Sequence, residues 1–186
     1  MEPRTIEIRR HAKRRKPGSN LTTEGIRRAQ SASTSDREYA LVVTSSLPRA
    51  LQTAVAMGHG VDEEDWTMAS MGEVAASYPW EAGFGEMQHA IRTDAVASAY
   101  SALQTLQLRH YLGRIAPGEA VLVVSHGGIA EAGIIGLLGD LDASSFGPSL
   151  DYCEGARIQL DGDSVRRVEL LRFEGEVEYT ALELEP

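Results

Sequence analysis

Two histidines and two arginines each stand shortly after a β-rich apolar run of the chain. They are Arg10, His11, Arg49 and His126. Guanidinium groups bind the planar oxygens of a phosphate through paired hydrogen bonds, and an imidazole can act as a nucleophile or carry a proton. Together, these residue types indicate a pocket for a tetrahedral anion and covalent chemistry on a phosphoryl group.

The roles of these side chains follow from the negative charge of a phosphoryl group. Arg10 and Arg49 would fix the group and stabilise the charge of the transition state. If His11 is the nucleophile, it must attack as a neutral imidazole, and two neighbouring guanidinium charges disfavour its protonated form near pH 7. A protonated His126 would add a further donor to the phosphoryl oxygens, and the following Gly127-Gly128 would let backbone amides approach the anion closely.

The elements that would hold these residues alternate between strands and helices. The apolar runs predict strands at residues 5–8, 40–43 and 120–124, which precede the four side chains. Capping residues and composition predict helices over 22–33, 48–57 and 127–138, and one long helix or two over 86–112. Residues 58–85 are expected to form a loop with short pieces of structure, and the tail predicts strands at 156–160, 164–173 and 177–182.

Alternating strands and helices predict a three-layer α/β/α fold with a mainly parallel central sheet, in a single domain spanning residues 1–186. In such sheets, ligands bind outside the carboxyl ends of the strands. Three of the predicted strands end in polar residues that could react with or bind a ligand. The two histidines and two arginines are therefore expected to gather at one edge of the sheet.

The order of these motifs resembles the histidine phosphatase superfamily, also called phosphoglycerate mutase-like. Arg10-His11-Ala12 resembles its Arg-His-Gly signature, residues 45–54 its second phosphate-binding element, and residues 123–128 its second histidine motif. Residues 21–30 resemble the helix start that follows the signature, so the resemblance reaches from about residue 5 to residue 138. It implies a short, phosphatase-type member with a phosphoglycerate mutase-like fold, a phosphohistidine intermediate, and no metal or other cofactor.

The resemblance also implies a carboxylic acid that protonates the departing alkoxide. In the family, this acid lies in the loop after the second helix, ahead of a segment like Gly-x-Trp-Glu-Gly. Here, Met71-Gly72-Glu73 precedes Trp80-Glu81-Ala82-Gly83. Glu73 is therefore predicted as the proton donor, with Glu81 as the alternative. The chain departs from the family pattern at Ala12, where glycine is usual, and at Pro17, where asparagine is frequent.

Charge and composition limit the kinds of molecule that the chain is expected to bind. The chain carries 27 acidic and 18 basic residues, a net charge of −9, which argues against a general affinity for nucleic acid. Nine Lys or Arg nevertheless fall within the first 28 residues, and this cationic end suits a small anion. Lys13, Arg14, Arg15 and Lys16 could bind a second anionic group of a substrate. The expected partner is a phosphorylated small molecule or a phosphoprotein.

The single cysteine excludes an internal disulfide and a multi-thiolate metal site. A zinc site on His11 and His126 is disfavoured because the flanking arginines would repel a divalent cation. No run approaches the roughly 20 apolar residues of a membrane span, and the start of the chain has no signal-peptide pattern, so a cytoplasmic location is expected. The β-rich tail could offer an edge strand for a homodimer.

Two alternatives to the hydrolase stay open. The first is a phosphoglycerate mutase-type phosphoryl transferase, which would use the same pocket. The second is a catalytically weak phosphate-binding module, motivated by Ala12 and by the choice between Glu73 and Glu81.

Overall fold

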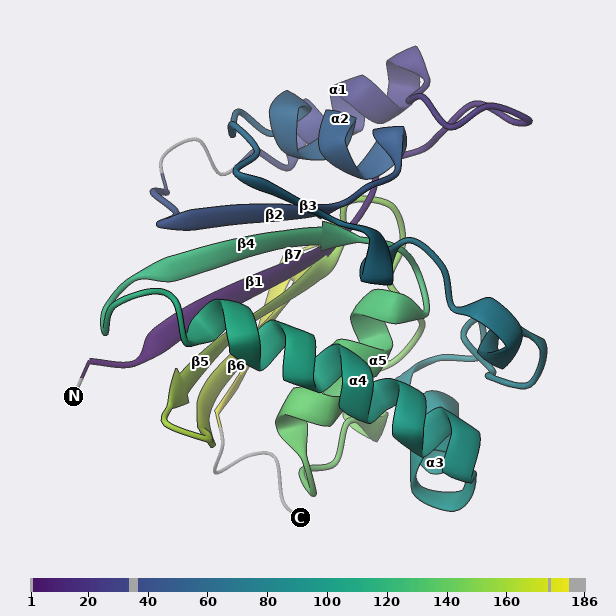
Figure 1. Cartoon of the computed structure of the whole chain (residues 1–186), viewed down its shortest axis with the longest axis vertical. Helices are drawn as coiled ribbons and strands as arrows, with labels where there is room; N and C mark the ends of the chain where they lie inside the picture. The colour runs from purple at the N-terminus through teal and green to yellow at the C-terminus, as the bar shows by residue number, and fades with distance from the viewer. Residues whose placement is uncertain (1, 34–36, 174, 181–186) are drawn as a thin grey trace.

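A seven-stranded sheet runs through the centre of the computed structural model, which describes residues 2–33, 37–173 and 175–180 (Figure 1). The strand order is β3-β2-β4-β1-β5-β6-β7. The first four strands in this order are parallel: β1 (Arg4–Arg10), β2 (Leu41–Ser45), β3 (Glu63–Asp65) and β4 (Ala120–Ser125). The other three continue the sheet in antiparallel fashion: β5 (Gly155–Asp161), β6 (Ser164–Arg172) and β7 (Gly175–Thr180).

Helices cover both faces of the sheet, which confirms the predicted three-layer α/β/α arrangement (Figure 1). One face carries α1 (Thr23–Ser31) and α2 (Pro48–Ala56). The opposite face carries α3 (Phe84–Thr93), α4 (Ala95–Leu112) and α5 (Ile129–Leu138). Three short 3₁₀ helices lie in the connections: η1 (Trp66–Met68), η2 (Gly72–Ala76) and η3 (Ser144–Phe146).

Strand β4 shows how the parallel part of the sheet is stabilised. Its side chains alternate between the two helical layers, as the pleat of a strand requires. Val121 and Val123 belong to the large apolar cluster on the side of α4 and α5, whereas Leu122 and Val124 pack with Ala50 and Ala54 of α2. Because both faces are buried, the strand reads in the sequence as a continuous apolar run.

Local capping explains where the helices begin. The Thr22 hydroxyl accepts a hydrogen bond from the Gly25 N–H at the start of α1, and Pro48 occupies the first turn of α2. Asp94 caps α4 by accepting from two backbone N–H groups. Its extended backbone, at φ −113° and ψ 123°, separates α3 from α4. Of the two alternatives predicted for residues 86–112, the structure therefore has two helices and not one long helix.

The register of the strands brings the predicted site residues to one edge. Arg10 at the end of β1 lies opposite Ser125 at the end of β4, and Thr44 of β2 lies opposite Val124. The backbone N–H of His11 donates to the carbonyl of Ser125 at 2.8 Å. The segments that follow β1, β2 and β4 therefore leave the sheet side by side.

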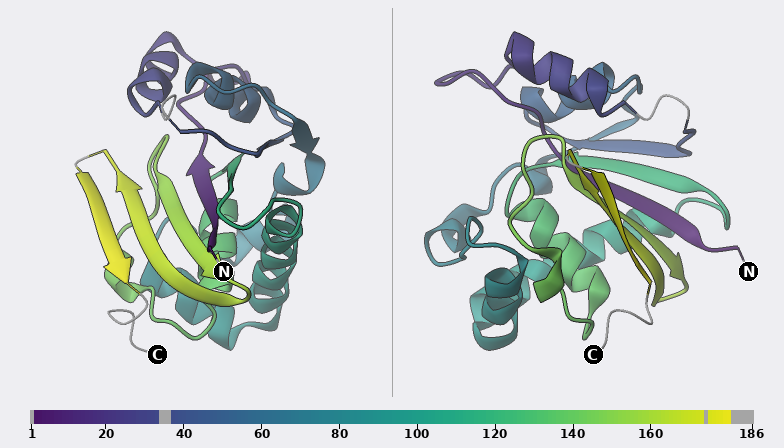
Figure 2. Two further views of the ribbon diagram at one scale, coloured as in Figure 1. Left: turned by 90° about the vertical axis from the view of Figure 1, so that its left-hand side faces the viewer. Right: turned by 180° about the vertical axis from the view of Figure 1, so that it is seen from behind.

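The antiparallel strands of the tail extend the sheet away from β1, in yellow-green to yellow in Figure 2. The predicted strand at 177–182 corresponds to β7. Positions 181 and 182 of this prediction lie outside the described residues. No helix within the described ranges is long and apolar enough to cross a membrane.

Candidate active site

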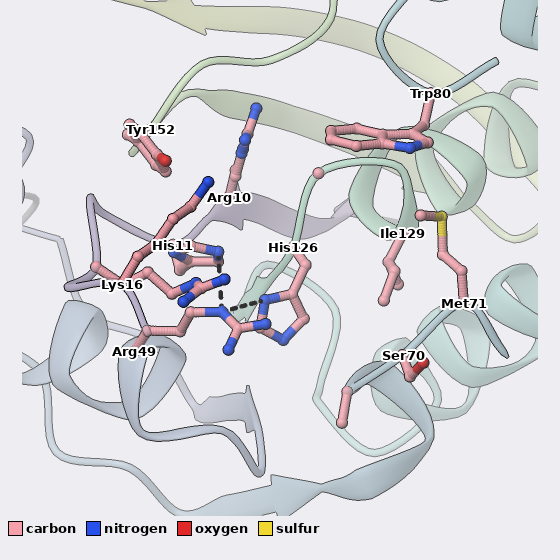
Figure 3. Close-up of a pocket in the computed structure, with 13 residues that line it drawn as sticks. Arg10, His11, Lys16, Arg49, Ser70, Met71, Trp80, His126, Ile129 and Tyr152 are labelled. Carbon is pink, nitrogen blue, oxygen red and sulfur yellow. Dashed lines mark hydrogen bonds between the residues drawn. The ribbon is translucent and has the colours of Figure 1, made fainter. Parts of the chain in front are cut away.

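The imidazoles of His11 and His126 lie side by side at the carboxyl edge of the sheet. Their ring centroids are 4.9 Å apart, and only 7% of His11 and 6% of His126 is exposed. The Arg49 Nε–H points between the two rings, 3.1 Å from His11 Nε2 and 3.2 Å from His126 Nδ1 (Figure 3). One guanidinium group therefore joins two imidazoles that are 115 residues apart in the chain.

The hydrogen bonds of His11 define which of its nitrogens carries the proton. Its Nδ1 lies 2.6 Å from the carbonyl oxygen of Ala12, which can only accept, so Nδ1 is protonated. Its Nε2 accepts from Arg49 and is therefore the nitrogen without a proton, which carries the lone pair of the neutral ring. The ring is thus presented as the tautomer whose Nε2 can attack an electrophile in the pocket.

His126 has the opposite tautomer. Its Nδ1 accepts from Arg49, so the proton of the neutral ring sits on Nε2 and is donated to the Ser45 hydroxyl at 2.6 Å. Ser45 also accepts from the backbone N–H of Leu47, which fixes the hydroxyl at the end of β2. A strand-terminal serine thereby orients the second histidine.

Both imidazoles are held neutral. The pKa of His11 is lowered from 6.5 to about 3, chiefly by burial and further by Arg49 and Arg10, against the opposing effect of the Ala12 carbonyl. The pKa of His126 is lowered to about 2, again chiefly by burial, and then by His11 and the arginines. The predicted direction for His11 is correct, but desolvation contributes more than the guanidinium charges.

Arg10 is fixed by the segment before β5. Its Nη1 donates to the carbonyl of Leu150, and its guanidinium lies 4.9 Å from the centre of the Tyr152 ring. Its Nε–H is buried without a hydrogen-bond partner. No carboxylate within the described part of the chain forms an ion pair with Arg10 or Arg49. The positive charge of the site is therefore left for an anion.

Two glycines leave room for this arrangement. A Cβ at Gly127 would lie 3.0 Å from Cζ of Arg10, and a Cβ at Gly128 would lie 2.6 Å from the sulfur of Met71. Gly128 also has a φ of +81°, a conformation that L side chains rarely adopt. Side chains at these positions would displace the guanidinium group or the far wall of the pocket.

These groups open into a pocket of about 250 Å³. Cationic and imidazole side chains gather on one side in Figure 3, and Met71, Trp80 and Ile129 form an apolar wall on the other. Four of the lining residues are arginine or lysine, and none is aspartate or glutamate. The four are Arg10, Arg14, Lys16 and Arg49.

The structure does not bring the two predicted proton donors to the pocket. Glu73 lies in η2 and Glu81 follows Trp80, but both carboxylates are exposed and neither lines the cavity. Their loop contributes Met71 and the Trp80 ring instead. The loop singled out by the sequence pattern therefore borders the pocket through other side chains, and the proton donor stays a prediction.

Sequence reasoning also passed over residues that the structure places at the site. Ser45 begins the segment that resembles the second phosphate-binding element, and its hydroxyl binds His126. Its position at the end of a strand is the sequence signal that could have indicated a role in the site. Ser19 accepts from Arg49 Nη1 at 3.1 Å. Tyr152, which packs beside Arg10 and His11, follows an irregular stretch and has no local signal. Among the described residues, no group of three His, Cys, Asp or Glu side chains could hold a metal ion.

No protein-family model and no curated protein sequence matches the chain. Solved structures do. A phosphoserine phosphatase from Entamoeba histolytica, in complex with 3-phosphoglyceric acid, has a TM-score of 0.58 at 15% identity, over 83% of this chain and 90% of that one. A mycobacterial glucosyl-3-phosphoglycerate phosphatase has a TM-score of 0.53 at 20% identity, over 91% and 97%. A phosphoglycerate mutase from Bacillus anthracis has a TM-score of 0.56 at 16% identity, over 88% and 91%.

The chain has the phosphoglycerate mutase-like fold. The fold implied by the motif resemblance is therefore confirmed. Within this phosphoglycerate mutase-like fold, the two histidines and two arginines that carried the resemblance meet around one cavity.

Proposed function

We propose that the protein is a phosphomonoester hydrolase with His11 as its nucleophile. The observation that carries the proposal is the unprotonated Nε2 of a neutral His11, which faces a pocket lined by four cations and no carboxylate. Two of the structurally similar proteins are phosphatases, which also supports hydrolysis of a phosphate ester.

In the first step, the Nε2 lone pair of His11 attacks phosphorus, and the bond from phosphorus to the leaving oxygen breaks. The departing oxygen takes up a proton. The imidazole ring then carries a positive charge, which the Nδ1–H shares with the Ala12 carbonyl at 2.6 Å. Arg10 and Arg49 bind the phosphoryl oxygens, for which Arg49 must turn its Nε–H from the imidazoles to the anion.

In the second step, water attacks phosphorus, the bond to Nε2 breaks, and His11 regains its lone pair as inorganic phosphate forms. The guanidinium groups supply the positive charge that a metal ion supplies in other phosphatases, so the proposed reaction needs no metal. His126 would assist after taking up a proton in the presence of the dianion, since a nearby negative charge raises the pKa of an imidazole.

The proton for the leaving oxygen is assigned to Glu73, with Glu81 as the alternative. Both are exposed in the described structure. Either one would act after a rearrangement of the loop that carries Met71 and Trp80, which already line the pocket. Leaving groups that are stable as anions would not depend on this step.

A small pocket favours a small substrate. At about 250 Å³, the cavity is below the roughly 300 Å³ at which sites for drug-sized ligands begin. It suits a small phosphorylated metabolite or a phosphohistidine side chain of a protein.

Hydrolysis of p-nitrophenyl phosphate in EDTA tests the proposal. We expect turnover by the native protein and a loss of more than about 10³-fold in His11→Ala, because the nucleophile is removed. The exposed His89→Ala serves as the matched control. Equal rates for the native protein and His11→Ala would refute the role of His11, and loss of activity in EDTA alone would refute metal independence.

A product analysis with the native protein distinguishes a hydrolase from a mutase. Incubation with 2- or 3-phosphoglycerate would release inorganic phosphate in the first case and interconvert the two isomers in the second. Binding of phosphate without turnover of any phosphomonoester would favour the weak binding module.

A further inference from the structure

The pocket carries more positive charge than one phosphoryl group can neutralise. Its lining contains four arginine or lysine side chains and no acidic one. A phosphomonoester brings about two negative charges near pH 7. Arg49, which donates to both imidazoles, and Arg10, which lines the same pocket, are sufficient to clamp it. Two cations remain.

The remaining two come from the loop that follows β1. Arg14 is half-buried, and its Nη1 donates to the carbonyls of Gly18 at 2.8 Å and Arg15 at 3.3 Å. These bonds fix the guanidinium group without neutralising it. Lys16 lines the same cavity. In the described part of the chain, neither side chain forms an ion pair with a carboxylate.

The two other cations of this loop are used differently. Lys13 pairs with Glu24 at 2.7 Å on the surface. Arg15 lines a separate, mainly apolar groove formed by residues of α1 and α2. The loop thus divides its four positive charges, with two directed to the cavity and two away from it. Only the first pair is placed to meet a substrate.

Arg14 lines the pocket and also influences the charged state of the residues proposed to react there. Its charge contributes to the lowered pKa of His11 and of Arg49, which places it within electrostatic reach of the nucleophile. The apolar wall of Met71, Trp80 and Ile129 would face the carbon skeleton of a bound molecule.

We propose that Arg14 and Lys16 form a second anion-binding subsite, and that the substrate is a small phosphomonoester with another anionic group a few bonds from its phosphoryl group. The inference rests on the proposed function, because the phosphoryl group must occupy the site of His11. The second group is a carboxylate or a second phosphate, since both are read by the same charge-assisted hydrogen bonds.

Binding of phosphonates, which cannot be hydrolysed, tests the subsite without turnover. Isothermal titration calorimetry would compare methylphosphonate with phosphonoacetate, which adds a carboxylate, and with methylenediphosphonate, which adds a second phosphonate. We expect the native protein to bind at least one of the doubly anionic ligands about 10- to 100-fold more tightly than methylphosphonate. The tighter of the two identifies the second group.

The variants assign this preference to residues. Arg14→Gln/Lys16→Gln should lose the preference while still binding methylphosphonate. Lys13→Gln/Arg15→Gln removes the same charge from the same loop and should keep it. A native protein that binds all three ligands equally would overturn the subsite and leave the phosphatase proposal intact, as would an equal loss in both double variants. If no phosphonate binds, the phosphate pocket itself fails, and the subsite fails with it.

Turnover gives a second readout. The ratio of kcat/KM for 2-phosphoglycerate to that for glycerol 2-phosphate measures the effect of a carboxylate in place of a hydroxymethyl group. We expect a ratio of about 10 or more in the native protein and in Lys13→Gln/Arg15→Gln, and a ratio near 1 in Arg14→Gln/Lys16→Gln.

Discussion

The buried neutral imidazoles predict how the stability of the free protein depends on pH. Each pKa in the folded state lies below the ordinary value of 6.5, at about 3 for His11 and about 2 for His126. Below pH 6.5, the unfolded chain therefore takes up protons that the folded protein does not. The free energy of unfolding must fall as the pH is lowered from 6.5 toward the folded-state values.

The size of this effect follows from the two shifts. Between pH 6.5 and 4.5, each folded imidazole stays neutral while its unfolded counterpart becomes almost fully protonated, which costs about 2 kcal/mol per histidine. The pair thus removes about 4 kcal/mol over this interval, a large share of the 5–15 kcal/mol that stabilises a typical domain.

Urea unfolding at pH 6.5 and pH 4.5 measures the effect. Carboxylates also titrate in this range, so the informative quantity is the difference between variant and native protein. His11→Asn cannot titrate and should lose about 2 kcal/mol less than the native protein on acidification. His89→Asn, at an exposed position of α3, should follow the native protein. A His11→Asn variant that loses as much stability as the native protein would refute the reasoning.

Three further changes test other parts of the site. Arg49→Lys removes the Nε–H that reaches both imidazoles and replaces the planar guanidinium with a single ammonium, so kcat/KM for p-nitrophenyl phosphate should fall about 10²- to 10³-fold while the circular dichroism spectrum is retained. Gly128→Ala must adopt a φ near +81° and overlap a sulfur atom, so its urea midpoint should drop by the equivalent of about 1–3 kcal/mol, and an unchanged midpoint would contradict the crowding. Glu73→Gln should slow hydrolysis of an alkyl phosphate about 10²- to 10⁴-fold and that of p-nitrophenyl phosphate far less; if Glu81→Gln shows this pattern instead, the acid is Glu81.

The parts of the fold that the sequence predicted are those with local physical causes. A buried strand such as β4 reads as an apolar run, and Thr22 marks the start of α1 because a hydroxyl can satisfy a free N–H there. Strand alternation also explains why the neighbouring Arg9 and Arg10 have different surroundings. Arg9 turns to the other face, where it pairs with the buried Glu7 at 2.7 Å.

The parts that stayed open depend on contacts between distant segments. Tyr152 reaches the pocket because the chain between α5 and β5 returns to the end of β1, where Cys153 donates its N–H to the carbonyl of Arg10. No local pattern encodes such a return. The proton donor is difficult to predict for a related reason. A glutamate in a loop with short 3₁₀ turns lies in no periodic pattern that would show which way its side chain points.

In the proposed mechanism, the shared hydrogen bond of Arg49 links substrate binding to the protonation of the site. In the free pocket its Nε–H occupies the lone pairs of both imidazoles, and burial keeps both rings neutral. When a phosphoryl group draws the guanidinium away, both lone pairs become free in the presence of new negative charge. In the proposed reaction, the lone pair of His11 then faces phosphorus and forms a bond. That of His126 can accept a proton, while the opposite nitrogen of this ring still donates to Ser45. In the proposed mechanism, movement of one guanidinium therefore exposes the nucleophile and prepares the second histidine as a donor, which gives the two imidazoles different roles although both are neutral at rest.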